Sequence, residues 1–432
     1  MKRLIQGTLI ALVTGTVLLA AKSHTLTIDK AIEIGLKHSP DVDISRFDFK
    51  RAIERNKFQK GYYLPRVDLG AAAGRTGASF NQQGNIDSAL LLGSLSASQL
   101  LYDFGKTSGR VDASSEEAHA LEANMNQVIS TKILKIKARY YDALKMKSII
   151  RVANENIKLQ KGQLRRAQRY YDNGIKTIID VSDAEVRLIT AKLELNNSEY
   201  ELKLRRALLE EEIGYAPYSG DYRLYHKKLD LSSISSHLPR VSTSLGALEK
   251  FAYAHRFELK SSQYFVKSSQ AIVESEKGGY LPTLSLRGDY TAQDVDNKFS
   301  AITPEKQWQA GVEVKWNLFA GRQTDASVQE AKISALKAAS QVDNVRLLIK
   351  RQVIESSLEV KRTKDSVVLS ESIANASKKK YLQAKKRYEN DLSDYIELQE
   401  AQQSYIQSLG DLVTTYYDYY ISIAQLDFAV GR

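Results

Sequence analysis

The sequence contains no cysteine, which excludes disulfides, a thiolate nucleophile, a cysteine-ligated metal and a lipid anchor on an N-terminal cysteine. Only 6 of its 432 residues are proline, so long uninterrupted helices are permitted. Tryptophan is also scarce, with 2 residues against 24 tyrosines. Hydrophobic residues make up 43% and charged residues 26%, which is the balance of a globular chain and not of a disordered one.

Arrangements that carry catalysis are lacking as well. The 6 histidines show no metal-ligand spacing, and the paired carboxylates fall at expected helix starts instead of beside a histidine or a nucleophile. No phosphate-binding or dinucleotide glycine pattern occurs. We therefore predict no enzymatic activity, no cofactor and no metal site. The net charge of +11 is spread along helical segments, which indicates solvated helix faces and not a nucleic-acid partner.

The N-terminal segment has the pattern of a secretory signal peptide. Lys2 and Arg3 precede an apolar stretch that ends at the small residue Ala21. The alternative is a membrane anchor, since about 18 apolar residues is the lower limit for a spanning helix. We predict a signal peptide at 1–21. No later segment resembles a transmembrane helix, so an exported chain of this kind is expected to be either soluble or a β-barrel protein.

An internal duplication runs through most of the chain. The tripeptide Tyr63–Leu64–Pro65 recurs 217 residues later as Tyr280–Leu281–Pro282. Further pairs share this offset: His38/His255, Tyr171/Tyr388, Asn173/Asn390, Asp180/Glu397, Ala184/Ala401 and Gly214/Gly431. A constant offset indicates one supersecondary unit that is present twice. We predict a first repeat at 22–214, a linker at 215–240 and a second repeat at 241–432.

Each repeat has the same internal order. A helical segment comes first, at 28–60 and at 245–277, and the Leu-Pro pair ends it. Two strand-like runs follow in each repeat, joined by loops predicted at Gly74–Asp87 and Gln293–Thr303. The clearest run is 307–318, where Trp308, Val312 and other apolar residues alternate strictly with polar ones.

A very long helix is predicted after each strand pair, at 111–173 and at 324–390. About 60 residues of helix would span roughly 90 Å. Each long helix is followed by a sharp turn and a returning helix, and the second of these has a continuous apolar seam. The seam residues, spaced three or four apart, are Leu398, Ala401, Tyr405, Leu409, Leu412, Tyr416, Tyr419, Ile423, Leu426 and Val430. The helices are expected to pack as antiparallel coiled coils.

The strands suggest a barrel that several chains share. In lipid, an open sheet edge leaves backbone groups unsatisfied, so spanning strands must close into a barrel. Four strands per chain are too few to close one, so more than one chain must contribute. Strands of about 10 residues with aromatic ends suit an outer-membrane barrel. The alternative is a soluble sheet packed on helices.

In this order and spacing the chain resembles the TolC-type outer-membrane efflux proteins over nearly all of its mature length. The doubled helix, Leu-Pro, hairpin and long helical pair carry the resemblance. Local runs add to it: Arg169–Gly174, Ile179–Val181 and Leu101–Lys106 in the first repeat, and Arg387–Asn390, Ile396–Leu398 and Leu318–Arg322 in the second.

The resemblance implies a mainly α-helical homotrimer with a shared twelve-stranded membrane β-barrel and a periplasmic α-helical tunnel. It implies an outer-membrane location in contact with lipid, and a role as the passive export duct of a tripartite efflux or type I secretion system. A periplasmic adaptor protein and an inner-membrane transporter are the implied partners. The sequence does not name the exported substrate, because in such systems the transporter selects it.

The resemblance also points to residues at the two helix turns, where similar proteins close the tunnel. Acidic side chains toward the axis are expected at Asp180, Asp183, Glu397 and Glu400, which in a trimer would form rings of three carboxylates that favour cations. The other interpretation is structural. Thr177 with Asp180 and Asp394 with Glu397 have the spacing of a capping box at a helix start.

A latch that keeps the tip closed is expected to involve Tyr171, Tyr388 and Arg387, with Lys386 as an alternative cation. Ordinary packing is an equally good explanation of the tyrosines. Gly174 is expected to adopt a left-handed conformation that permits the turn, and Asp391 takes the corresponding place in the second repeat.

Two other kinds of protein remain open from the sequence. The first is a periplasm-spanning coiled-coil protein without a pore, which would require soluble strands. The second is a trimeric surface adhesin, which usually has a C-terminal barrel segment, whereas this chain ends on a helical pattern.

Overall fold

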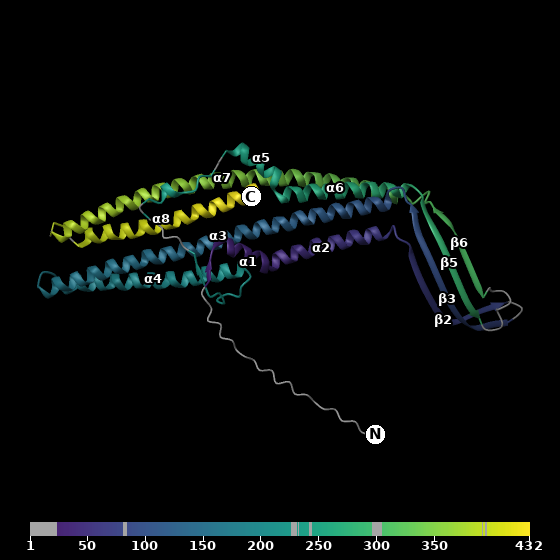
Figure 1. Ribbon diagram of the computed structural model, residues 1–432, viewed down its shortest axis with the longest axis horizontal. Helices are drawn as coiled ribbons and strands as arrows, with labels where there is room; N and C mark the ends of the chain where they lie inside the picture. Colours follow the sequence, from purple (N-terminus) through teal and green to yellow (C-terminus); the bar gives the residue numbers. More distant parts are fainter. Residues whose placement is uncertain are drawn as a thin grey trace, which may run out of the picture.

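A computed structural model describes residues 24–80, 84–225, 231, 233–241, 244–295, 305–390, 392–393 and 395–432, with the side chains of 76–80, 84–88 and 295 excepted. The predicted signal peptide 1–21 lies outside the described residues. Long helices run side by side along the molecule, and a bent four-stranded sheet extends from one end of them (Figure 1). Within the described residues, no helix is long and apolar enough to span a membrane.

The elements follow one another in the order β1 (His24–Leu26), α1 (Ile28–His38), α2 (Pro40–Gly61), β2 (Arg66–Phe80), β3 (Gly84–Tyr102), α3 (Lys106–Asp172), α4 (Ile178–Glu212), β4 (Tyr222–Leu224), η1 (Ser235–His237), α5 (Leu245–His255), α6 (Phe257–Lys277), η2 (Gly278–Tyr280), β5 (Thr283–Val295), β6 (Lys306–Lys315), α7 (Gln323–Glu389) and α8 (Tyr395–Val430). The order of a helical segment, two strands and two long helices occurs twice, as the sequence predicts.

The first helical segment of each repeat is broken into two helices, whereas the sequence predicts one continuous segment. In the first repeat Ser39 is extended and Pro40, which has no backbone N–H to donate, begins α2. In the second repeat the break falls at Arg256, a residue that is 1% exposed. Its guanidinium donates to the carbonyls of Phe428 and Ala429 at 3.1 and 3.3 Å, so the break is tied to the end of α8.

The long helices α3 and α7 have 67 residues each, so each spans roughly 100 Å. α3 begins at Lys106, five residues before the predicted start, because the left-handed turn at Gly105 (φ +98°) directs the chain from β3 into the helix. α3 pairs with α4 and α7 pairs with α8 as two helical hairpins (Figure 1). The seam predicted in α8 is confirmed, since Leu398, Leu412 and Val430 are fully buried.

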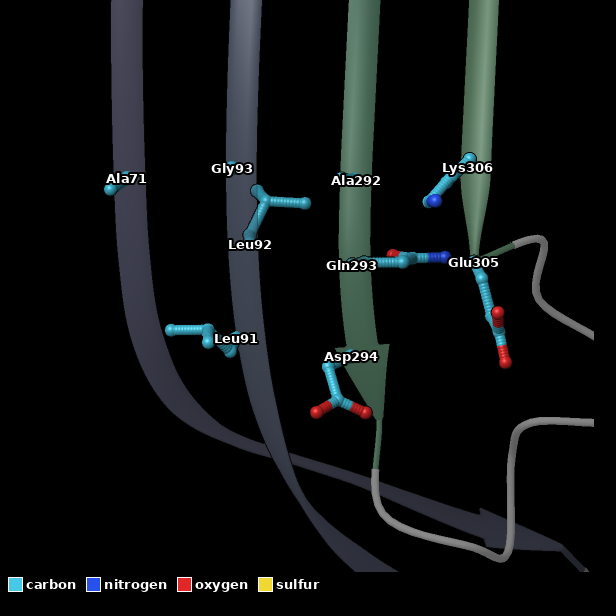
Figure 2. Close-up of a pocket in the computed structure, with 9 residues that line it drawn as sticks. All are labelled: Ala71, Leu91, Leu92, Gly93, Ala292, Gln293, Asp294, Glu305 and Lys306. Carbon is cyan, nitrogen blue, oxygen red and sulfur yellow. The ribbon is translucent and has the colours of Figure 1, made fainter.

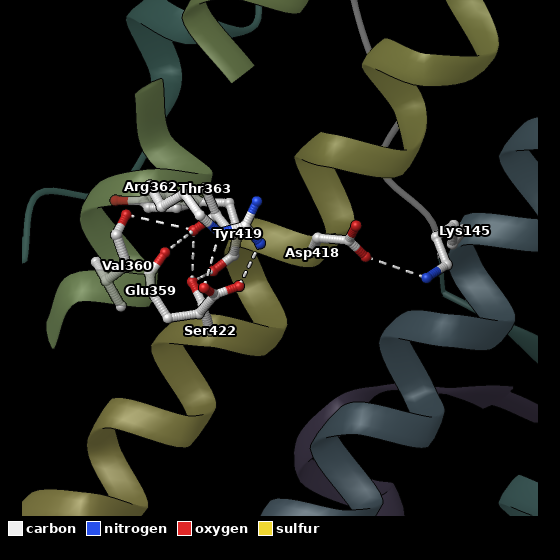
Figure 3. Close-up of polar contacts among 8 residues, drawn as sticks. All are labelled: Lys145, Glu359, Val360, Arg362, Thr363, Asp418, Tyr419 and Ser422. Atoms are coloured by element: carbon white, nitrogen blue, oxygen red, sulfur yellow. Dashed lines mark hydrogen bonds and ion pairs between the residues drawn. The ribbon is translucent and has the colours of Figure 1, made fainter. Parts of the chain in front are cut away.

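Two kinds of polar contact fix the hairpins (Figure 3). Between α7 and α8, the hydroxyls of Thr363 and Ser422 lie 2.9 Å apart and are both buried. Between the repeats, Lys145 of α3 donates to Asp418 of α8 at 3.1 Å. The core is therefore shared by both halves of the chain.

The two repeats lie side by side in the same order at three levels along the molecule, which are the sheet, the helices next to it and the helices farther away. The sheet has the order β2-β3-β5-β6. Next to it, contacts between neighbours give the helix order α2-α3-α6-α7, and farther away they give α4-α3-α8-α7. At each level the first repeat supplies one edge and the second repeat supplies the other.

All neighbouring strands of the sheet are antiparallel, and they are longer than predicted. β2 and β3 extend through most of the segment predicted as the loop Gly74–Asp87, and β5 reaches Val295 within the other predicted loop. β6 ends at Lys315, three residues before the alternating pattern ends. The predicted linker also holds a strand, because β4 pairs in parallel with β1.

Candidate functional site

One face of the sheet is apolar and uncovered. The register places Leu69, Leu95, Tyr290 and Trp308 in one row across all four strands. Their exposed fractions run from 41% for Tyr290 to 83% for Leu69. The face of the sheet that carries this row, together with Val67, Leu286, Val312 and Val314, is called the apolar face below. An apolar surface of this size requires a cover that this chain does not provide among its described residues.

The opposite face, called the polar face below, carries serine, glutamine and charged side chains. Its rows include Asp68, Ser96, Asp289 and Gln309. β2 and β6 are the edges of the sheet, and each pairs with one strand only among the described strands. A two-faced antiparallel sheet with open edges is suited to closure with strands of other chains.

Exposed aromatic and apolar side chains gather where the strands meet the helices. Trp316, Leu318 and Phe319 follow β6, and Phe319 is 82% exposed. Tyr102 is the last residue of β3, Phe104 follows it, and their rings contact edge to face at 4.7 Å between centroids. Tryptophan and tyrosine are enriched at membrane interfaces, so this belt is consistent with an interface between lipid and water.

A hollow of about 550 Å³ lies on the sheet where β5 ends and β6 begins (Figure 2), and β2 and β3 continue past it. Its lining includes Leu91, Leu92, Gln293 and Lys306. Leu91 and Leu92 point to opposite sides of β3 (Figure 2), so the lining belongs to both faces of the sheet. Among the described residues no group of three or more His, Asp or Glu side chains could hold a metal ion.

The other end of the molecule is the helical tip, defined here as residues 164–184 and 381–401. Gly174 has φ +72° and donates its N–H to the carbonyl of Tyr171 at 2.9 Å, which ends α3 and turns the chain toward α4. Asn390 directly follows α7, as Asn173 directly follows α3. Asp391 and Asp394 lie outside the described residues.

The structure places the predicted carboxylates of the first repeat at the start of α4. Asp180 accepts from the backbone N–H of Thr177 at 3.0 Å and from its hydroxyl at 2.9 Å, as in a capping box. Asp183 is exposed one turn farther along the helix. Asp180 therefore stabilises the start of α4, whether or not it also lines a pore.

In the second repeat the structure brings a predicted latch residue and a predicted constriction residue together. Arg387 donates to Glu397 at 2.8 Å and to the carbonyl of Leu392 at 3.3 Å, so it bridges the turn between α7 and α8. Glu400 is exposed and lies about one turn farther along α8.

The two predicted latch tyrosines differ in their surroundings. Tyr171 is 42% exposed, whereas Tyr388 is 6% exposed and lies 6.4 Å from Tyr170 and 6.0 Å from Tyr395, measured between ring centroids. Burial raises the pKa of Tyr388 to about 12. Tyr388 therefore joins α3, α7 and α8 at the tip, whereas Tyr171 faces solvent.

One contact at the tip was missed in the sequence. Arg166 of α3 donates to Glu389 of α7 at 2.9 Å, and its guanidinium lies 5.9 Å from the ring of Tyr388. The two residues are 223 positions apart and do not share the repeat offset. No sequence signal links them, because only the packing of one hairpin against the other brings them together.

A sheet with an apolar face, open edges and two helical hairpins of this length defines a class of protein, the outer-membrane channels with a helical extension. The family model of the outer membrane efflux protein matches residues 31–214 and 250–432. The chain belongs to this family, whose members are outer-membrane channel proteins.

Individual relatives agree with this. The outer membrane protein TolC of Vibrio cholerae is 22% identical over 401 residues, which cover 88% of this chain and 85% of that protein. The crystal structure of the outer membrane protein VceC from Vibrio cholerae gives a TM-score of 0.78 at 17% identity, over 94% of this chain and 96% of that chain. The Campylobacter jejuni CmeC outer membrane channel gives a TM-score of 0.78 at 17% identity, over 94% and 85%.

Proposed function

We propose that this chain forms, as a homotrimer, the passive outer-membrane duct of a tripartite efflux or type I secretion system, gated at its helical tip. The observation that carries the proposal is the sheet with an uncovered apolar face and two open edges, continued by helices roughly 100 Å long. A periplasmic adaptor and an inner-membrane transporter would complete the system, and the transporter would supply the energy.

The edges of the chain favour a closed ring. Because the first repeat supplies one edge and the second repeat supplies the other at all three levels, copies would join head to tail. Both helical edges expose apolar side chains. On α4 these are Val186, Ile189, Leu193, Tyr200 and Leu204, and on α7 they are Leu336, Leu347, Leu358 and Leu369.

The sheet favours a barrel in lipid. Strand directions alternate across β2-β3-β5-β6, so a β6 edge that meets the β2 edge of the next copy would again be antiparallel. Three copies of the four-stranded sheet would supply twelve strands, which is an allowed size for an outer-membrane barrel. The apolar face would meet lipid and the polar face would line the lumen.

The tip contacts favour a gate. One ion pair, Arg166–Glu389, and the buried ring of Tyr388 join the two hairpins of one chain at the tip. A second ion pair, Arg387–Glu397, bridges the turn between α7 and α8. In a trimer, Asp180, Asp183, Glu397 and Glu400 would each recur three times around the axis, and carboxylate rings in a narrow pore favour cations. Opening would require these contacts to separate.

The competing function is a periplasm-spanning coiled-coil protein without a pore. It would leave the apolar face in water, which is costly for a surface that includes Leu69 at 83% and Trp308 at 76% exposure. The apolar face therefore favours the duct.

Conductance of the detergent-extracted trimer in a planar bilayer tests the proposal. The wild type is expected to conduct weakly and the variant Arg166→Ala/Arg387→Ala more strongly, since both tip bridges are lost. Glu397→Ala/Glu400→Ala should also raise conductance and reduce the preference for cations. Lys145→Ala is the matched control, because it removes a bridge between the same two repeats away from the tip.

If the wild type and both tip variants form folded trimers but none of them conducts, the duct is contradicted and the coiled-coil protein is favoured. Conductance that rises as much in the Lys145→Ala control would contradict a gate at the tip.

A further inference from the structure

The polar face carries its charges in a narrow zone near the helices. Within the strands, the charged side chains that the structure describes on this face are Arg66, Asp68, Arg287, Asp289, Glu313 and Lys315. The rows farther from the helices are uncharged within the strands: one row holds Gly70, Ser94, Thr291 and Gln307, and the next holds Ala72, Leu92 and Gln293. The described charges of this face therefore lie in the four rows nearest the helices, and the two Arg-Asp pairs occupy two adjacent rows among them.

On two strands an arginine is paired with the aspartate two residues along, and on β5 the arginine also lies 3.9 Å from Glu313 of β6. The Nε of Arg66 lies 2.8 Å from Asp68 on β2, and the Nε of Arg287 lies 2.9 Å from Asp289 on β5. Gln309 of β6 donates to Asp289 at 3.0 Å. The neighbouring strands present small side chains, Ser96 and Ser98, beside these pairs.

The register aligns the two pairs, although the repeat offset does not. Arg66 follows Pro65 directly, whereas Arg287 lies five residues after Pro282. Both arginines are nevertheless opposite Ser98, and both aspartates are opposite Ser96. The same Arg-x-Asp pair thus lies in the same two rows on β2 and β5, although the two pairs lie at different distances in sequence from the preceding proline.

We propose that Arg66–Asp68 and Arg287–Asp289 form a charge collar that balances the two signs of charge and so keeps the helix-side mouth of the barrel permeable to ions of both signs. The proposal rests on the proposed function, since it requires that the polar face line a lumen. In a trimer the collar would be a layer of six arginines beside a layer of six aspartates. The two layers cancel in net charge, so the mouth itself would admit ions of both signs.

Neutralisation of one layer should leave the charge of the other layer unbalanced. Without the aspartates the arginines would attract anions, and without the arginines the aspartates would attract cations. A change of one kT in the energy of a monovalent ion alters its local concentration by roughly threefold, and the ratio of cations to anions changes by more than that because the two signs shift in opposite directions. The collar is thus distinct from the carboxylates of the helical tip, which carry one sign only.

The test measures reversal potentials in a potassium chloride gradient across a planar bilayer, with the tip opened by Arg166→Ala/Arg387→Ala. In that background, Asp68→Asn/Asp289→Asn should shift the permeability ratio toward chloride by at least roughly threefold. Arg66→Gln/Arg287→Gln should shift it toward potassium by a similar factor. Ser96→Ala/Ser98→Ala is the control at the same height and should leave the ratio unchanged.

A fourth variant exchanges the order of charges at both pairs, by Arg66→Asp/Asp68→Arg and Arg287→Asp/Asp289→Arg. It keeps the pairs and the net charge, so it should form trimers and retain the unshifted ratio. Conducting trimers with the same reversal potential in both neutralised variants would overturn the collar and leave the duct intact. Absence of conductance in the tip-opened background itself would instead overturn the duct.

Discussion

At the scale of single residues, the two repeats end in the same way. Gly214 and Gly431 follow α4 and α8 with φ of +78° and +83°, a conformation that residues with a side chain rarely adopt. A Cβ on Gly214 would lie 2.5 Å from the carbonyl oxygen of His38, and one on Gly431 would lie 3.1 Å from the carbonyl carbon of His255. Each glycine thus packs against the break in the first helix of its own repeat.

Alanine at either glycine should destabilise the protein, and Gly214→Ala should cost more. The left-handed conformation costs about 1–2 kcal/mol for a residue with a Cβ. The clash with His38 should add about 1–3 kcal/mol of overpacking. Thermal unfolding of the detergent-solubilised protein, followed by circular dichroism, measures the order of the midpoints. The control Gly410→Ala lies inside α8 with nothing within 4 Å of its Cβ, and should stabilise by about 0.5–1 kcal/mol. Equal shifts in all three variants would contradict this account.

The tip residues show which kinds of contact can be predicted from the sequence and which cannot. The spacing of Thr177 and Asp180 predicted a capping box, and the structure contains its contacts, because a cap depends only on neighbours in sequence. The bridge from Arg166 to Glu389 depends on the packing of two hairpins and has no local pattern. The predicted pore and latch roles stay predictions until conductance is measured.

At the scale of elements, the long helices and the strands are predictable because their signals repeat many times along each element. Breaks and registers rest on fewer residues. Pro40 offered a local signal for the break between α1 and α2, but the break at Arg256 depends on carbonyls at the end of α8. The predicted loop Gly74–Asp87 was wrong because glycines in it belong to paired strands, where neighbours in the sheet override local preference.

The exposed leucines of α7 have a regular spacing. Leu336, Leu347, Leu358 and Leu369 follow one another at intervals of 11 residues and are 55–69% exposed. Eleven residues make three turns of a helix with little drift, so the leucines form one nearly straight stripe. Such a stripe is suited to a partner helix along its whole length.

Charges in this stripe should prevent trimer formation and leave the single chain folded. Leu347→Lys/Leu358→Lys removes apolar area that is exposed in the chain itself, so helix content should be unchanged. Light scattering of the detergent-solubilised protein should report monomers instead of trimers. Gln341→Lys is the control, because it adds a charge to an exposed position on the other side of α7. Trimers that persist in the double variant would place the interface elsewhere.

At the scale of the whole molecule, duplication explains why the edges match at every level. The two repeats lie side by side, so the sheet and both helical layers end on the first repeat at one side and on the second repeat at the other. A head-to-tail interface can repeat around a closed ring, whereas a two-fold interface would join like edges and stop at two copies. Ring closure therefore predicts which edges meet.

Disulfide cross-linking distinguishes the two arrangements, and the absence of native cysteine makes every cross-link an introduced one. Cysteine at Leu69 of β2, combined in turn with cysteine at Trp308, Ala310 or Val312 of β6, should give a ladder that ends at a covalent trimer. At least one combination should succeed, because opposed residues of antiparallel strands bring Cα atoms to about 5 Å, within disulfide range. Leu69→Cys alone should give no cross-link. A dimer from that single variant, without a trimer from any pair, would show that like edges meet and would exclude the ring.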